Sequence, residues 1–126
     1  MAAGRDPVDA LPSGVRNVLW IVMDTTRRDR MTVYDPELDT TPNLARLAAQ
    51  GAVFEGASSS STFTLSSHAS MLTGLSPSGH NATLRTQWLS PRVPMLQVEL
   101  GQAGLATAAF VANRVLRLEV GLEAGF

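Results

Sequence analysis

Residues 64–74 read Thr64-Leu65-Ser66-Ser67-His68-Ala69-Ser70-Met71-Leu72-Thr73-Gly74, and this stretch predicts a helix from Thr64 to Leu72. Leu65, Ala69 and Leu72 recur at helical spacing, so they share one apolar face. The helix therefore begins with a hydroxyl. Backbone N–H groups at a helix N-terminus favour an anion.

An apolar run upstream predicts a buried strand. The run from Val15 to Met23 is rich in apolar and β-branched residues, and Asp24 follows it directly. In open α/β sheets, ligands bind beyond the carboxyl ends of the strands. A carboxylate at that place is well suited to bind a hard cation. The alternative is that Asp24 caps a loop or pairs with Arg27 or Arg28.

The rest of the chain alternates between short apolar runs and helical patterns. Further strands are expected at residues 52–54 and 106–112. Helices are expected from Thr41-Pro42 to Gly51 and from Pro94 to about Ala103. Loops are expected at residues 24–39, 58–62 and 75–91. This rhythm of strand and helix predicts an α/β fold with a parallel sheet.

Composition limits the classes of function. The chain has 126 residues, enough for one domain, and its 44% hydrophobic content supports a packed core. The net charge of -1 gives no sign of a nucleic-acid partner. Cysteine is absent, which excludes disulfides, zinc–thiolate sites and a cysteine nucleophile.

The N-terminus does not have the pattern of a signal peptide. Residues 1–14 contain two aspartates, two prolines and no apolar run, so we expect a flexible segment there. The first apolar run is shorter than the roughly 20 residues that span a bilayer. We therefore expect a cytoplasmic protein without a membrane segment. The alternative is a start codon further upstream.

Thr64 and His68 are the candidate catalytic residues. A hydroxyl beside a divalent cation can be ionised and attack a phosphorus or sulfur centre. His68 lies one turn further along the same helix, where it can contact an ester oxygen or the leaving group. The alternatives are that Thr64 caps the helix and that His68 is an ordinary half-buried helix histidine.

Taken in order, these motifs resemble the N-terminal part of the sulfatase family, in the alkaline phosphatase superfamily. The resemblance covers roughly residues 15–126. The motifs that carry it are Asn17–Arg27, Thr40–Leu44, Gly51–Phe54, Thr64–Gly74, Pro94–Leu96 and Gly104–Val111. It implies an alkaline phosphatase-like three-layer sandwich with a mostly parallel sheet. Residues 15–126 would be the incomplete N-terminal portion of such a catalytic domain.

The resemblance assigns roles to individual residues. Asp24 matches the first metal-binding aspartate of the family, and Thr64 matches the nucleophile. Sulfatases proper have a cysteine or serine there, which becomes formylglycine within a C/S-x-P-x-R pattern. This chain has Ser66 and His68 in place of the proline and the arginine, so no formylglycine can form. The pattern points to the branch with a threonine nucleophile, which includes phosphoryl transferases and phosphodiesterases. His80 stands roughly where the family has a basic residue after TG-x-x-P.

The resemblance also implies a divalent metal ion bound by Asp24 and Thr64. Thr25 replaces a second aspartate, so the affinity for calcium should fall, and manganese, zinc or magnesium fits better. In this branch an aspartate and a histidine from far downstream complete the metal site. The expected substrate is a small-molecule, glycan or lipid ester of phosphate or sulfate, and the oligomeric state stays open.

Two readings without catalysis stay open beside this one. The first is a sulfatase-like protein that only binds its ligand, which the departures at Thr25, Ser66 and His68 allow. The second is a truncated remnant, whose incomplete sheet would have an exposed edge.

Overall fold

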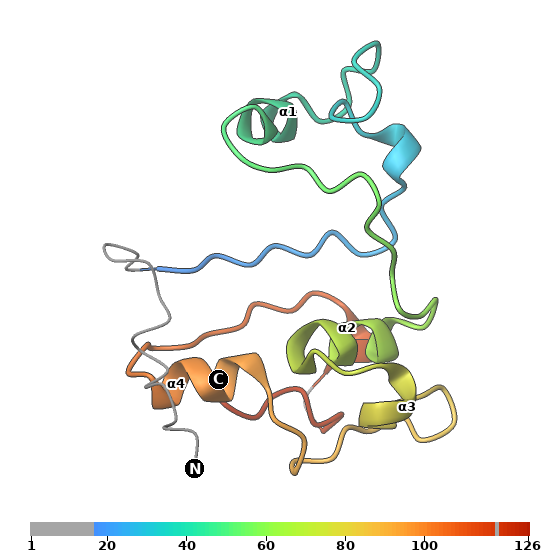
Figure 1. Cartoon of the computed structure of the whole chain (residues 1–126). Helices are drawn as coiled ribbons and strands as arrows, with labels where there is room; N and C mark the ends of the chain where they lie inside the picture. The colour runs from blue at the N-terminus through green and yellow to red at the C-terminus, as the bar shows by residue number, and fades with distance from the viewer. Residues whose placement is uncertain (1–16, 118) are drawn as a thin grey trace, which may run out of the picture. The chain divides into compact units, whose positions relative to one another are not determined.

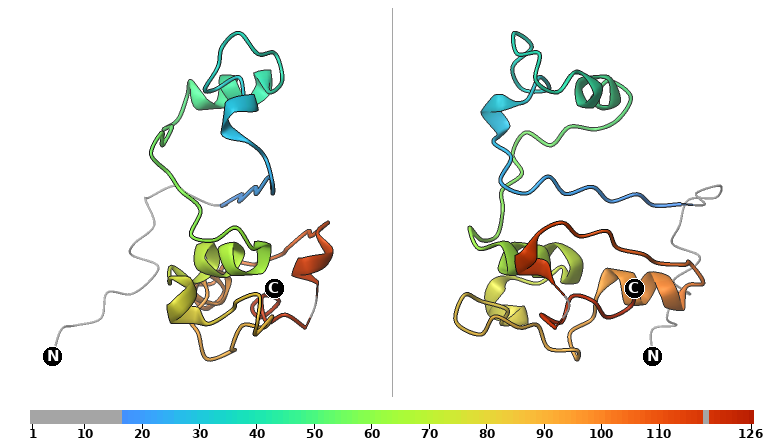
Figure 2. Two further views of the ribbon diagram at one scale, coloured as in Figure 1. Left: turned by 90° about the vertical axis from the view of Figure 1, so that its right-hand side faces the viewer. Right: turned by 180° about the vertical axis from the view of Figure 1, so that it is seen from behind.

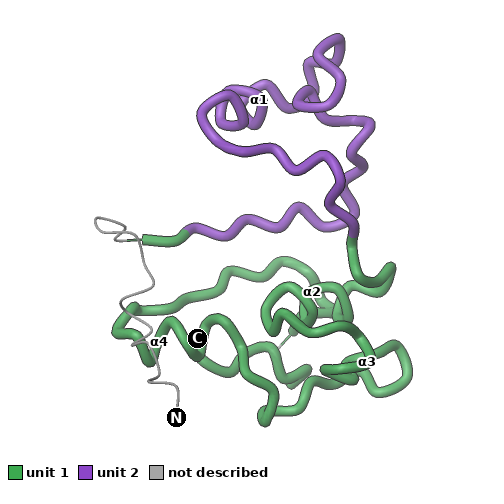
Figure 3. The backbone as a smooth tube through the Cα atoms, in the orientation of Figure 1, with its two compact units in different colours: residues 1–18, 59–126 green, residues 19–58 purple. Residues whose placement is uncertain are grey.

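The chain forms two compact units. The computed structural model describes residues 17–117 and 119–126. Unit 1 comprises residues 1–18 and 59–126, and unit 2 comprises residues 19–58 (Figure 3). The segment 1–14, which we expected to be flexible, lies outside the described residues.

All regular structure in the described residues is helical. The elements are the 3₁₀ helix η2 (Arg28–Arg30), α1 (Pro42–Ala48), α2 (Thr64–Thr73), α3 (Pro77–His80), α4 (Leu96–Gln102) and the 3₁₀ helix η3 (Arg114–Leu116) (Figure 1). None of the described helices has both the length and the hydropathy that crossing a membrane requires.

The expected three-layer α/β sandwich with a mostly parallel sheet is wrong for the described residues, which contain no strand. Residues 17–23, 52–54 and 106–112 lack regular structure, and the first and last of these segments run extended (Figure 1). The apolar runs alone do not make a strand, because a strand also needs a neighbour that completes its ladder of hydrogen bonds. No described segment supplies that neighbour, so Leu19 stays 84% exposed and Phe110 99% exposed.

Helix α2 confirms the prediction made from its apolar face. Leu65 and Ala69 are buried, and Leu72 packs against the same cluster. The cluster lies in unit 1 and consists of Leu65, Ala69, Ala82, Leu89, Met95, Val120 and Leu122. Helix α2 contacts α3, α4 and η3 (Figure 2). The buried face of α2 therefore organises the core of unit 1.

The other two predicted helices are present but shorter. Helix α1 begins at Pro42 as expected and ends at Ala48, before Gly51. Thr41 precedes it, but its hydroxyl accepts a hydrogen bond from the Thr32 N–H at 2.9 Å instead of capping the helix. Helix α4 begins at Leu96, two residues after Pro94, because Met95 is still extended and is buried in the core.

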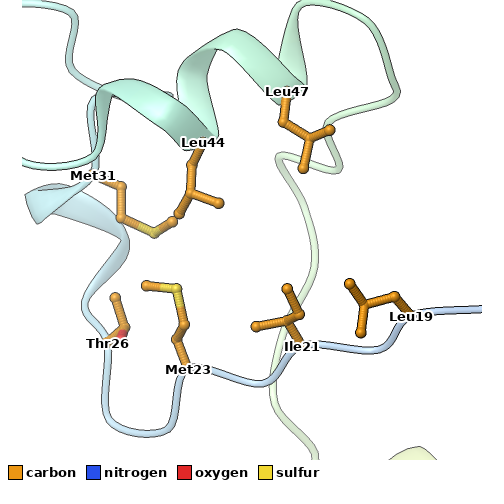
Figure 4. A pocket seen from close by; sticks show the side chains of 7 residues that line it. All are labelled: Leu19, Ile21, Met23, Thr26, Met31, Leu44 and Leu47. Atoms are coloured by element: carbon orange, nitrogen blue, oxygen red, sulfur yellow. The ribbon is translucent and has the colours of Figure 1, made fainter.

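Unit 2 contains an apolar hollow of about 430 Å³. Its lining consists of Leu19, Ile21, Met23, Thr26, Met31, Leu44 and Leu47 (Figure 4). Leu19, Ile21 and Met23 alternate along an extended segment and point to the side where Leu44 and Leu47 of α1 lie (Figure 4). Leu44 and Leu47 therefore lie on the same face of α1. The lining has no titratable side chain, so the hollow offers no group for acid–base chemistry.

We predict that Leu65→Ala lowers the free energy of unfolding by about 2–5 kcal/mol, the usual range for a leucine truncated in a core. Leu65 is 1% exposed and belongs to the core cluster of unit 1. The matched control is Leu84→Ala, because Leu84 is 66% exposed and its truncation should cost less than about 0.5 kcal/mol. Urea unfolding at pH 7 measures both. Equal losses would show that Leu65 is not a core residue.

Candidate functional site

Helix α2 carries the candidate nucleophile at its first position. The helix begins at Thr64, as predicted. The N-cap residue is Phe63, whose backbone is extended, so Thr64 is the first helical residue and does not occupy the cap position. Thr64 is half-buried. Its side chain thus stands at the helix end where N–H groups and the helix dipole favour negative charge.

The Thr64 carbonyl accepts two side-chain hydrogen bonds. The Ser67 hydroxyl donates one at 3.0 Å, and Nδ1 of His68 lies 2.8 Å from the same oxygen. A carbonyl oxygen cannot donate, so Nδ1 of His68 must carry the proton. In the neutral ring, Nε2 then has the free lone pair. The structure therefore joins both predicted catalytic residues in one helical turn.

The half-buried ring of His68 also fits the alternative interpretation. An ordinary helix histidine can donate to the carbonyl four residues earlier in the same way. His68 contacts the backbone carbonyl of Thr64 and not the hydroxyl. For chemistry, the consequence of this contact is that it fixes the tautomer of His68 and leaves Nε2 without a proton in the neutral ring.

Asp24 lies in the other compact unit. It is exposed and forms a turn with Thr25, in which the Thr26 N–H donates to the Met23 carbonyl at 3.3 Å. Thr25 has a φ of 58°, a left-handed conformation that is strained for a β-branched residue. Asparagine and aspartate tolerate this conformation better. Position 25, where the resemblance places a second aspartate, thus has a backbone that suits an aspartate better than a threonine.

The neighbouring arginines have partners within unit 2. Arg27 forms an exposed ion pair with Asp29 at 2.6 Å, and its hydrogen bond holds the pKa of the Asp29 carboxyl below its usual range. Arg28 donates to the Glu55 carbonyl at 2.8 Å and lies over the Tyr34 ring, 4.5 Å from its centroid. Arg27 and Arg28 are therefore surface residues.

A serine–histidine pair that was not predicted from the sequence joins α2 to α3. The Ser70 hydroxyl is 2.9 Å from Nε2 of His80. The sequence analysis placed His80 in a loop, whereas it ends α3. The two residues are ten positions apart, a separation that no helical or strand period connects. The sequence therefore shows a serine and a histidine at these positions but does not indicate that they form a pair.

Within the described part of the chain, no group of three or more histidine, aspartate or glutamate side chains is arranged to hold a metal ion. Asp24 belongs to unit 2 and Thr64 to unit 1. The carboxylate and the hydroxyl are oxygen donors, the type that hard divalent cations prefer. Their number is smaller than such a cation requires.

Comparison with known proteins identifies the family. The sequence profile of the sulfatase family matches residues 16–113, more than half of the chain. No curated protein and no solved structure matches the chain at a significant level. The matched range contains Asp24, Thr64, His68 and His80. The chain belongs to the sulfatase family of hydrolases.

Proposed function

We propose that this protein cleaves phosphate or sulfate esters, with the Thr64 hydroxyl as nucleophile and a divalent cation as cofactor. One observation carries the proposal. Thr64 begins a helix within the range that matches the sulfatase family. The resemblance places the nucleophile of the family at this position.

The chemistry has two displacement steps. The Thr64 hydroxyl gives up its proton to the solvent, and its oxygen bonds to phosphorus or sulfur as the bond to the leaving oxygen breaks. The leaving oxygen takes up one proton from the solvent. Water then attacks the same centre and releases Thr64 together with inorganic phosphate or sulfate. The backbone N–H groups at the start of α2 face the negative charge that develops in each step. Thr64 thereby acts as a covalent catalyst.

His68 assists through Nε2. Because Nδ1 donates to the Thr64 carbonyl, Nε2 is the nitrogen that remains for the substrate. The neutral ring accepts a proton there, whereas the protonated ring donates a hydrogen bond to an ester oxygen. His68 thus orients the ester in its protonated form and takes up a proton in its neutral form.

Asp24 and Thr64 are the proposed ligands of the cation within the described residues. They supply two oxygens, while hard cations take about six ligands, so these two residues fit such an ion only in part. When bound, a divalent cation supplies Lewis-acid polarisation of the ester and lowers the pKa of a bound hydroxyl. Manganese, zinc or magnesium is preferred over calcium because Thr25 brings no carboxylate.

We favour a phosphate ester over a sulfate ester as the substrate. Thr64 cannot be converted to the formylglycine that sulfatases proper use. The group that carries the ester is a small molecule, a glycan or a lipid.

We predict that the chain, treated with a chelator and then dialysed, hydrolyses aryl phosphate esters only after manganese, zinc or magnesium is added. Omitting the ion should lower kcat/KM by about a hundredfold or more. Polarisation by a metal contributes several kcal/mol, and about 1.4 kcal/mol corresponds to a factor of ten. Release of aryl phenolate from phosphate monoesters, phosphate diesters and sulfates measures this dependence.

The same assay distinguishes the alternatives. Calcium is the control ion and should restore less activity than manganese. Mass spectrometry should find Thr64 unmodified in the active protein before substrate is added. If no ester is hydrolysed with any of the ions, catalysis by this chain is excluded, and the two non-catalytic interpretations, a binding protein or a truncated remnant, replace this proposal.

A further inference from the structure

His80 is an almost fully enclosed titratable side chain at the end of α3. It is 2% exposed and is one of the largest buried side chains of unit 1. The buried residues Ala69 and Ala82 belong to the core of the same unit. Burial of a polar ring is unfavourable unless both of its nitrogens have hydrogen-bond partners. Both nitrogens of His80 have one.

These two hydrogen bonds determine the tautomer. The Ala82 N–H donates to Nδ1 of His80 at 3.0 Å, so Nδ1 must be without a proton. The proton of the neutral ring is therefore on Nε2, which donates to the Ser70 hydroxyl 2.9 Å away. Ser70 belongs to α2, and Ala82 belongs to the loop after α3. We call these two hydrogen bonds the His80 link.

The surroundings of His80 favour the neutral ring. Burial lowers the pKa of His80 below its usual value, against smaller opposing effects from backbone hydrogen bonds at Ser66 and at His80 itself. Helix α2, which packs on α3, contains one other titratable side chain, His68, and its Nδ1 is bonded to the Thr64 carbonyl. Helix α3 and the loop 81–83 contain no further titratable side chain. No described charged side chain therefore stabilises a protonated His80.

We propose that His80 is a positioning residue for α2. The neutral ring of His80 holds this helix against the loop after α3 through its hydrogen bonds with Ser70 and Ala82. Ser70 lies six residues after Thr64, about 9 Å along the same helix axis. A helix moves as a unit over this length, so the His80 link also sets the place of Thr64 and His68. The effect of the His80 link on catalysis rests on the proposed function. The effect of the His80 link on the position of α2 is independent of that function.

The His80 link makes this placement sensitive to acid. A proton on Nδ1 would bring an N–H against the Ala82 N–H and leave a charge in an apolar environment. The unfolded chain binds this proton at the ordinary histidine pKa, and the folded chain binds it at a lower pH. The stabilisation is therefore fully present above the unfolded pKa and is lost as the pH falls through the folded pKa.

The tautomer and the titration of His80 can be observed directly. The chain has two histidines, so His68→Gln leaves His80 as the only one and assigns its signals. In the full chain with ¹⁵N-labelled histidine, we expect His80 to be the Nε2–H tautomer at pH 7 and to titrate below pH 6.5. The Nδ1–H tautomer, or titration at pH 6.5 or above, would overturn the proposal without requiring any variant at His80.

Hydrogen exchange of the α2 amides tests the positioning. Between pH 7 and a pH below the folded pKa that the ¹⁵N titration gives for His80, after correction for the intrinsic rate, we expect protection in the unmodified chain to fall about tenfold, the factor of one lost buried hydrogen bond. His80→Gln cannot be protonated, and its amide can still donate to Ser70, so its protection should not change with pH. Ser70→Ala should reduce protection at both pH values. Equal pH dependence in the His80→Gln chain would contradict the proposal.

The two proposals can fail separately. If ester hydrolysis is found, kcat should fall less at acid pH in His80→Gln than in the unmodified chain, while KM changes little, because His80 does not touch substrate. The same fall in both chains would count against the catalytic consequence. If no hydrolysis is found, the proposed function fails, while the tautomer and the exchange rates still decide the role of His80.

Discussion

Thr64→Ala is expected to lower kcat/KM for aryl phosphate ester hydrolysis by about ten-thousandfold or more. Removing the nucleophile of a covalent mechanism leaves only the binding groups and the electrostatic stabilisation of the site. The fold should persist, because Thr64 is half-buried outside the core cluster and alanine favours a helix more than threonine does. Steady-state kinetics in the presence of manganese measure the loss, and circular dichroism verifies the helix content.

Two further variants make this test specific. Thr64→Ser keeps the hydroxyl and should retain measurable hydrolysis. Thr62→Ala makes the same replacement two residues upstream, at an exposed position before α2, and should leave the rate unchanged. In the unmodified chain, rapid quenching should trap a phosphoryl group on the peptide that contains Thr64. Hydrolysis by Thr64→Ala at the full rate would exclude Thr64 as the nucleophile.

Gly121→Ala is expected to lower the free energy of unfolding by more than about 3 kcal/mol, a loss at the high end for single substitutions. A Cβ atom at this position would collide with the Leu89 carbonyl oxygen, and a backbone atom cannot move aside as a side chain can. The close approach exists because the Leu89 N–H donates to the Val120 carbonyl at 2.8 Å. Leu89 and Val120 both belong to the core of unit 1.

Gly104→Ala is the matched control for this variant. Gly104 and Gly121 both have a φ of 88°, but a Cβ atom at Gly104 meets nothing within 4 Å. Gly104→Ala should therefore cost only the strain of the left-handed backbone, about 1–2 kcal/mol. Urea unfolding of both variants separates backbone strain from the collision at Leu89. Equal losses would mean that residues 89 and 120 are not in contact in solution.

The helix α2 could be predicted from the sequence because its determinants are local. Each hydrogen bond of an α-helix joins residues four apart, and the spacing of Leu65, Ala69 and Leu72 marks the face that is buried. The start at Thr64 was therefore predicted correctly. The start of α4 was placed two residues too early, since Pro94 permits a helix start but does not require one.

The expected sheet could not be established from the sequence for the opposite reason. Leu19, Ile21 and Met23 have the alternation of a strand, but a strand also depends on a partner elsewhere in the chain. The alternation shows which side chains share one side of the segment, but it does not identify the segment that would pair with it as a neighbouring strand. The prediction of an α/β sandwich was therefore wrong for the described residues.

The sequence by itself determined that the chain belongs to the sulfatase family, that Thr64 begins a helix and which face of that helix is buried. Each of these follows from short-range spacing or from the order of motifs. Only the tertiary structure decided that His80 is buried, that it binds Ser70 and Ala82, and which of its nitrogens carries the proton. The reason is physical: a contact between α2 and α3 depends on how two helices pack in the core, and no local periodicity encodes that packing.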